Sequence, residues 1–265
     1  MEAMRGEFDL IAELFGPLAA KFPGALGLLD DGAIIRPRPD RDLVITKDLM
    51  VAGIHFAKDD PADAVARKLL RVNLSDLAAM GAEAIGYTLG FAAPPDIDIE
   101  WIRLFCRGLD QDQTIFDLSL IGGDTVQTLG PLTLSLTAFG DVPTGQALKR
   151  SNAQPGDKVM VSGTIGDGYL GLEVGHGMWP GISVEHRMYL IERLRIPEPR
   201  ISLGISLRGI ARGVADISDG LVADLGHICA ASRTGAIVHA DQVPLSSAAL
   251  AIEAIEGPGL TSGLL

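Results

Sequence analysis

The sequence has few residues that could form a disulfide framework or a zinc site. Only two cysteines occur in 265 residues, and Cys106 and Cys229 lie far apart without CxxC spacing. The five histidines form no HxxxH or HExxH pair, which argues against zinc. Two isolated cysteines are typical of reduced, buried thiols in a cytoplasmic protein.

Long apolar runs are also missing. No stretch of about 18 consecutive apolar residues occurs, so the sequence predicts no membrane span. The first residues carry acidic side chains within their apolar run and lack the cleavage site of a secretory signal peptide. We therefore expect a cytoplasmic protein without a membrane partner.

Positive charge is scarce as well. Lys and Arg number 22 against 34 Asp and Glu, a net charge of −12, so the chain would repel nucleic acid. Hydrophobic residues make up 47%, which excludes global disorder. Asp outnumbers Glu by 23 to 11. Because Asp is a poor helix former and a common Mg²⁺ ligand, the positions of the aspartates are informative.

Several familiar catalytic motifs are absent. The sequence contains no GxxxxGK[ST] P-loop, no VAIK, HRD and DFG set, and no GxSxG. Residues 163–171 include a formal GxGxxG, but the acid expected after a second strand is missing, which disfavours a dinucleotide site. No nucleophile or general base stands out.

Apolar periodicity predicts alternating helices and strands, which indicates an α/β or α+β fold with two domains, residues 1–145 and 146–265. In the first domain we expect helices at 7–22, 61–81 and 98–115 and strands at 33–36, 43–48, 84–93, 118–122 and 131–141. In the second we expect strands at 157–162, 214–216 and 235–240 and helices at 168–176, 183–194, 202–212, 219–232 and 246–255.

Short acidic motifs carry the clearest chemical signal. They are Asp30-Asp31-Gly32, Thr46-Lys47-Asp48, Asn73-Leu-Ser75-Asp76, Gly122-Gly123-Asp124 and Asp216-Ile-Ser218-Asp219-Gly220. Any one such aspartate could simply cap a helix or a turn. Asp76 differs because it continues the apolar stripe of Val65, Leu69 and Val72, where an unpaired carboxylate is costly. Several aspartates facing one cleft would suit two or more Mg²⁺ ions that hold a polyphosphate.

A phosphate site is the second signal. Gly122-Gly123-Asp124 is expected to end a strand and to expose backbone N–H groups where no side chain blocks a phosphate. The oxygens of an acceptor phosphate are largely deprotonated near pH 7, since its second pKa is about 6. Phosphoryl transfer to such an acceptor requires positioning and charge neutralisation but no base.

Further motifs occur in a fixed order along nearly the whole chain. They are GEFDLIAELF (6–15), Asp30-Asp31, D-x-x-V-x-G-x-H-F (48–56), NLSDLAAMGA (73–82), LIGGDT (120–125), RSNAQPGD (150–157), SGTIGDGYLGL (162–172) and DISDGL (216–221). Together they resemble the thiamine-monophosphate kinase family of the aminoimidazole ribonucleotide synthetase superfamily. The V-x-G-x-H-F and NLSDLAAMGA strings separate this family from synthetase and hydrogenase-maturation relatives, which share the DISDG-like and GGD-like pieces.

The resemblance implies an enzyme that uses ATP and several Mg²⁺ ions to convert thiamine phosphate to thiamine diphosphate by direct transfer. It also implies a homodimer in which the N-terminal domains share a β-barrel. The Mg²⁺ ligands carried over are Asp31, Thr46, Asp48, Asp76, Asp124, Asp216 and Asp219. The ATP contacts carried over are Gly123, Asp124, Arg150 and Ser218, and His55 would contact thiamine phosphate. Without the resemblance, His55 would be read as a turn residue and Arg150 as a surface charge.

Three departures from the family pattern stand out. Leu29 replaces a glycine before the Asp pair, and Lys47 replaces a threonine. Strand alternation turns Lys47 away from Thr46 and Asp48, so those two ligands are retained. The family also continues with a GG-[DE]-DYE motif whose Glu, with a later aromatic residue, contacts the thiamine. Neither is present here, so we expect a truncated C-terminal domain.

Two alternatives stay open at this point. One is another ATP-dependent superfamily member that acts on an amide or amidine substrate. The other is a nucleotide-binding fragment that is inactive because of C-terminal truncation.

Overall fold

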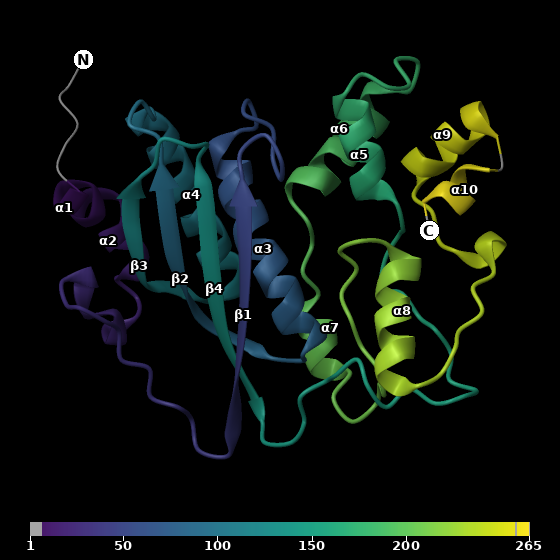
Figure 1. The fold of residues 1–265 in the computed structure, drawn as a ribbon, viewed down its shortest axis with the longest axis horizontal. Coiled ribbons are helices and arrows are strands. Elements are labelled where there is room, and N and C mark those ends of the chain that lie inside the picture. Colours follow the sequence, from purple (N-terminus) through teal and green to yellow (C-terminus); the bar gives the residue numbers. More distant parts are fainter. Residues whose placement is uncertain (1–6, 258, 265) are drawn as a thin grey trace.

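A computed structural model of the chain describes residues 7–257 and 259–264. The N-terminal half begins with helical turns and continues with four strands and two long helices (Figure 1). These elements are α1 (Glu7–Leu10), the π-helical turn η1 (Ile11–Phe15), α2 (Gly16–Ala19), the 3-10 segment η2 (Pro23–Leu28), β1 (Arg41–Val51), α3 (Ala62–Ala79), β2 (Glu83–Ala93), α4 (Ile99–Phe116), β3 (Ser119–Gln127) and β4 (Thr133–Pro143).

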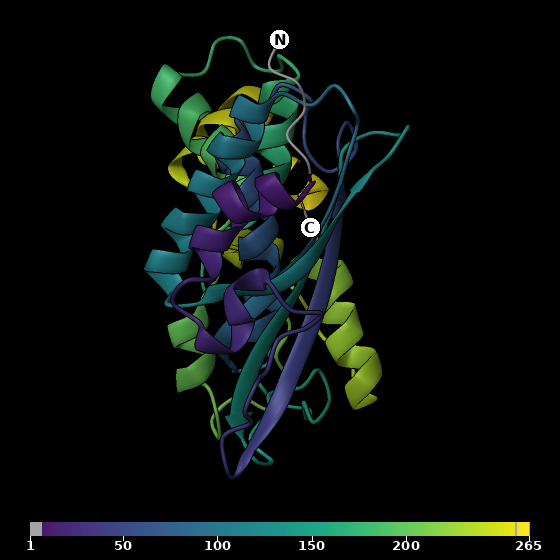
Figure 2. The same ribbon diagram turned by 90° about the vertical axis from the view of Figure 1, so that its left-hand side faces the viewer.

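The four strands form one mixed sheet in the order β1-β4-β2-β3. β4 pairs antiparallel with β1 and β2, whereas β2 and β3 are parallel. Side chains alternate between the faces, and β4 directs Leu134, Leu136 and Ala138 into the core. The helices α3 and α4 cover this face, and Figure 2 shows them on one side of the sheet.

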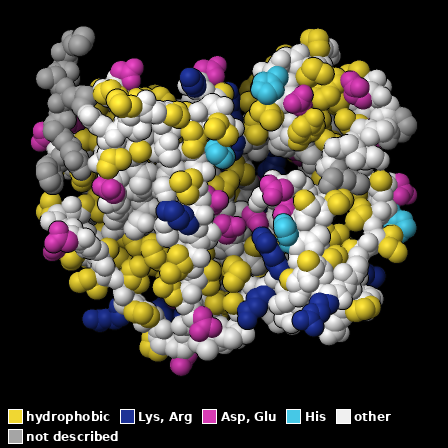
Figure 3. Space-filling view, in the orientation of Figure 1, with side chains coloured by type: hydrophobic (Ala, Val, Ile, Leu, Met, Phe, Trp, Pro, Cys, Tyr) yellow, Lys and Arg dark blue, Asp and Glu magenta, His cyan; other side chains and the backbone are white. Residues whose placement is uncertain are grey.

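The opposite face of the sheet is open and partly apolar. Leu43, Ile45 and Leu49 of β1 are 45%, 57% and 52% exposed, and Val126 of β3 is 49% exposed. Figure 3 shows apolar side chains gathered over this face of the N-terminal half. Within the described residues, no helix is long and apolar enough to cross a membrane.

The second half consists of helices and connecting segments around a smaller core. Its elements are α5 (Asp167–Gly175), α6 (Val184–Arg195), α7 (Ile201–Ser206), α8 (Leu221–Ser232), the 3-10 turn η3 (Ala240–Gln242), α9 (Ser247–Glu256) and α10 (Leu260–Gly263). Leu170, Val174, Leu190 and Ile252 pack together in its core.

Side chains from both halves hold them together. Arg195 pairs with Asp60 at 2.7 Å, and Arg71 of α3 donates to the carbonyl of Pro197 at 3.1 Å. α7 also packs so closely on α3 that a Cβ atom at Gly204 would lie only 2.0 Å from the carbonyl oxygen of Ala78. These contacts join the helices of the second half to α3 and to the segment before it.

The structure corrects several sequence predictions. The long helices and the strands at 43–48, 84–93 and 131–141 are confirmed with small shifts of their ends, but residues 33–36 have no strand neighbour and form none. The strand predicted at 118–122 extends to Gln127, because its parallel pairing with β2 continues that far.

The strands predicted at 157–162, 214–216 and 235–240 are wrong. Within the described part of the second half, these segments have no ladder of hydrogen bonds to a neighbouring strand, so the expected α/β character of this half is not seen. Short runs of apolar and β-branched residues favour an extended chain, but a strand also requires a partner. The helix expected at 202–212 ends earlier, at Ser206.

Candidate functional site

The first part of the candidate site lies between β1 and α3. Thr46 and Asp48 alternate with outward-facing residues of β1 and so point towards α3. The hydroxyl of Thr46 donates a hydrogen bond to the carboxylate of Asp76 on α3. Oδ2 of Asp48 is buried and has no hydrogen-bond partner among the described residues. Two neighbouring carboxylates with so few donors indicate a place for a cation.

Burial is the main influence on the pKa values of these two carboxylates. Burial raises the pKa of Asp48, and the nearby charge of Asp216 adds to this effect. Burial also raises the pKa of Asp76 to about 6, opposed by the Thr46 hydrogen bond. The charges of Asp216 and Asp48 raise the pKa of Asp76 further, while Arg150 lowers it. Asp48, Asp76, Asp216 and Arg150 are therefore close enough to interact, although they come from both halves of the chain.

The loop before α8 supplies the residues from the second half. Asp216 is half-buried, its Oδ2 accepts a hydrogen bond from the Ser218 hydroxyl at 3.4 Å, and Asp219 is exposed. Figure 3 shows acidic side chains gathered along the junction of the two halves, with basic side chains beside them.

Asp224 is a residue that the sequence analysis missed. Asp224 is 5% exposed, and its carboxylate accepts backbone N–H bonds from Ser218 at 2.9 Å and from Asp219 at 3.1 Å. The carboxylate thus folds back from the first turn of α8 and fixes the preceding loop. The sequence offers one signal for this role, because Asp224 lies four residues after Gly220 at the start of a helix. The same pattern is equally typical of a helix whose first turn simply carries an acidic residue.

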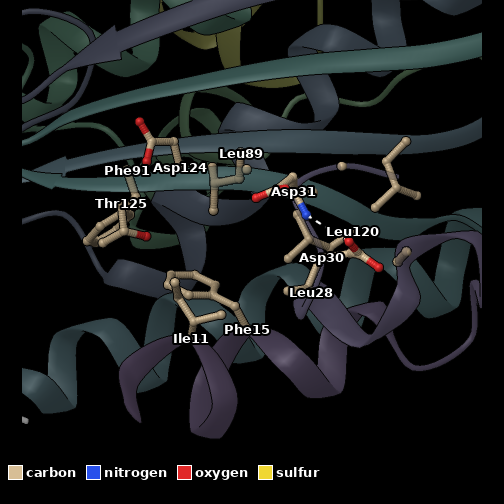
Figure 4. A pocket seen from close by; sticks show the side chains of 15 residues that line it. Ile11, Phe15, Leu28, Asp30, Asp31, Leu89, Phe91, Leu120, Asp124 and Thr125 are labelled. Carbon is tan, nitrogen blue, oxygen red and sulfur yellow. Dashed lines mark hydrogen bonds between the residues drawn. The ribbon is translucent and has the colours of Figure 1, made fainter. Parts of the chain in front are cut away.

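A second group of predicted residues surrounds a pocket at the β3 edge of the sheet. Asp30 and Asp31 lie at its rim together with Gly122, Gly123 and Asp124, as Figure 4 shows for the labelled aspartates. Its floor is apolar, formed by side chains that include Ile11, Phe15, Leu28, Leu89, Phe91 and Leu120.

The glycines of this rim lie within β3 and not at its end, which corrects the sequence analysis. Close packing explains one of them, because a Cβ on Gly123 would lie 2.1 Å from the carbonyl oxygen of Leu89. β3 is an edge strand of the sheet, so its outer side has no neighbouring strand and can still meet a phosphate.

His55 lies in the turn that follows β1. Its Nδ1 accepts the backbone N–H of Val51 at 3.1 Å, and its carbonyl accepts from Nζ of Lys68 at 2.8 Å. Burial lowers the pKa of Lys68, and the charge of Asp60 opposes this shift. The exposed ring of His55 is held by its Nδ1, which leaves Nε2 as the polar atom available to a ligand.

The site fits a Mg²⁺ ion that takes only some of its ligands from the protein. Among the described residues, no group of three or more His, Cys, Asp or Glu side chains is arranged to hold a metal by itself. The available donors are nevertheless hard oxygens, and the buried Oδ2 of Asp48 lacks any other partner. Mg²⁺ commonly binds through one or two carboxylates and completes its shell with water and substrate phosphates, which matches this donor set.

Comparison with known proteins gives consistent matches along the chain. The family model of the AIR synthase related protein N-terminal domain matches residues 29–142, and that of the C-terminal domain matches residues 154–259. The thiamine-monophosphate kinase of Caulobacter vibrioides is 50% identical over 245 residues, which is 92% of this chain and 68% of that protein.

Two solved structures have similar folds. The crystal structure of thiamine-monophosphate kinase from Stenotrophomonas maltophilia superposes with a TM-score of 0.84 at 39% identity, over 97% of this chain and 80% of that one. A structure described as AaThiL complexed with AMPPCP and TMP superposes with a TM-score of 0.80 at 27% identity, over 100% of this chain and 84% of that one.

Proposed function

Because the chain belongs to the thiamine-monophosphate kinase family of AIR synthase related proteins, we propose that it transfers the terminal phosphoryl group of ATP directly to the phosphate of thiamine phosphate. The similarity to a structure complexed with AMPPCP and TMP supports ATP and thiamine phosphate as its ligands. The observation that carries the proposal is the approach of Asp216 to Asp48 and Asp76 across the two halves, beside a buried carboxylate oxygen without a partner.

Each part of the site has a role in this reaction. Thr46, Asp48, Asp76 and Asp216 would hold Mg²⁺ at the junction of the halves, and Asp31, Asp124 and Asp219 would supply further ligands. Bound Mg²⁺ supplies positive charge that offsets the phosphates during transfer.

The remaining predicted residues bind and orient the two substrates. Gly123, Asp124 and Ser218 would contact ATP, and Arg150 would pair with its phosphates. The apolar floor below Asp30 and Asp31 suits the flat base of a nucleotide. His55 would contact thiamine phosphate through Nε2. No general base is required, because the acceptor oxygen is already largely deprotonated near pH 7.

The open face of the sheet supports a homodimer. It exposes Leu43, Ile45 and Leu49 on one edge strand, β1, and Val126 on the other edge strand, β3, of a face without a covering helix from its own half. Pairing of two such faces would bury these side chains and close a shared β-barrel. We assign the sheet half to residues 1–145 and the helical half to 146–265, since the two hydrophobic cores lie on either side of this boundary.

A coupled assay of ADP release tests the function. We expect turnover that requires ATP, Mg²⁺ and thiamine phosphate together, and that stops when EDTA removes the metal or when thiamine phosphate is omitted. ADP release that depends on an amide or amidine substrate and ignores thiamine phosphate would contradict the proposal. ATP binding by calorimetry without any turnover would contradict it as well.

A further inference from the structure

Lys47 lies on the face of the sheet proposed to pair in a homodimer, and it lines a pocket with Gly123 and Asp124 of the proposed nucleotide site. It belongs to β1, and its side chain points away from α3, opposite to its neighbours Thr46 and Asp48. Its Nζ donates a hydrogen bond to the hydroxyl of Ser135 on β4 at 2.7 Å. This bond draws the ammonium group from β1 over β4, towards the middle of the sheet.

Lys47 and Asp124 line the same small pocket. Lys47, Gly90, Gly123, Asp124 and Ser135 contribute to its walls. Ser135 lies opposite Gly90 in the sheet, and Gly90 lies opposite Asp124, so only a glycine separates the two polar positions. The floor between them is therefore bare backbone, which a bound group can approach closely.

Apolar side chains flank Lys47 on this face of β1. Leu43, Ile45 and Leu49 are the other outward-facing side chains nearby on β1. An ammonium group has three donors, and Ser135 accepts from only one of them. The two remaining donors can bind oxygens of an anion that enters the pocket. A carboxylate such as Asp124 would otherwise repel a phosphate, and a fixed positive charge beside it offsets that repulsion.

We propose that Lys47 binds the phosphate chain of the nucleotide and acts as a resident cation beside Asp124. This inference rests on the proposed function, in which Gly123 and Asp124 contact ATP. It adds a phosphate-binding residue from the open face of the sheet, whereas the other proposed ligands lie at the β3 edge and at the junction with the second half.

Calorimetry with Mg²⁺ and the non-transferable analogue AMPPCP tests the inference without turnover. Lys47→Met keeps the length of the side chain and removes its charge, and Lys47→Arg keeps the charge. A charge-assisted hydrogen bond lost from a site corresponds to about a tenfold to hundredfold weaker Kd. We expect that loss for Lys47→Met, near-normal affinity for Lys47→Arg, and no change for Lys21→Met, whose exposed lysine lies outside both pockets.

Salt provides a second measurement. The difference between wild type and Lys47→Met should shrink as NaCl rises from about 50 mM to about 500 mM, because screening weakens an exposed ionic contact. Sedimentation of each variant checks the association state. If Lys47→Met binds AMPPCP with wild-type affinity, the inference about Lys47 is wrong but the proposed function still stands. If that variant also changes its association state, Lys47 contributes to contact between two copies instead. Absence of AMPPCP binding by the wild type would overturn the proposed function itself.

Discussion

Replacing Asp76 by asparagine should have opposite effects on the metal-free protein and on its ligand binding. In the wild type, Asp76 is half-buried beside Asp48 and Asp216, and the Thr46 hydroxyl donates a hydrogen bond to it. Asparagine has nearly the same shape and can still accept the Thr46 hydrogen bond, but it carries no charge. The substitution therefore removes a costly carboxylate together with a proposed metal ligand.

The magnitude follows from the pKa of Asp76. Burial raises this pKa from 3.8 to about 6, so the folded state keeps a proton that the unfolded state has lost between these values. The wild type thus loses stability as the pH rises from about 4 to about 6. The full difference corresponds to about 3 kcal/mol. Because the carboxylate is only half-buried, solvent screening reduces the expected effect to about 1–2 kcal/mol.

Thermal unfolding in EDTA measures this effect. At pH 8 we expect Asp76→Asn to melt about 2–6 °C above the wild type, and at pH 4 we expect the two to coincide. With Mg²⁺ and AMPPCP the order should reverse, because only the wild type gains stability from the bound ligands. Asp110→Asn, an exposed aspartate on α4, is the matched control and should change neither result. Equal pH dependence in both proteins, or full ligand stabilisation of Asp76→Asn, would refute the reasoning.

Three further substitutions test other parts of the structure. Asp224→Ala should weaken Mg²⁺-dependent AMPPCP binding in calorimetry, because it releases the loop before α8. Asp224→Asn should recover part of the affinity, and unchanged binding in Asp224→Ala would show that Asp224 does not position the site. Asp112→Ala should lower the free energy of unfolding in urea by about 3–5 kcal/mol, because it leaves Arg71 buried without its 2.5 Å partner; a loss below about 1 kcal/mol would contradict this. Ile45→Asp should convert a dimer to a monomer in sedimentation, and an unchanged mass would refute the proposed interface.

The strongly periodic helices could be predicted from the sequence, whereas strands were wrongly predicted at segments that have no partner strand in the described structure. α3 and α4 are long amphipathic helices, and α4 begins at Asp98, whose side chain accepts the N–H of Glu100 at 3.0 Å. The apolar periodicity and the capping aspartate both depend only on nearby residues, and both are present in the folded chain. The apolar run at 159–161 is an equally local signal, but the described structure provides it with no adjacent strand. A strand depends on a neighbour that the segment itself does not specify.

The candidate site shows the same division. The apolar spacing around Asp76 indicated from the sequence that this carboxylate had to meet a partner, because an unpaired buried charge is costly. The sequence could also assign the chain to its family, since the motifs occur in order. The role of Asp224, by contrast, could not be predicted, because the loop before α8 must fold back to bring the backbone N–H groups of Ser218 and Asp219 to its carboxylate.

The amino-acid sequence by itself thus determined the family of the chain and the candidate residues for its chemistry, namely the short acidic motifs and the glycines beside them. Only the tertiary structure decided which of them meet. Asp216 comes close to Asp48 and Asp76 where the two halves of the chain meet, and Lys47 and Asp124 line one pocket although β4 and β2 separate their strands. Contacts between residues so distant in the chain depend on strand order and helix packing, which local periodicity does not encode.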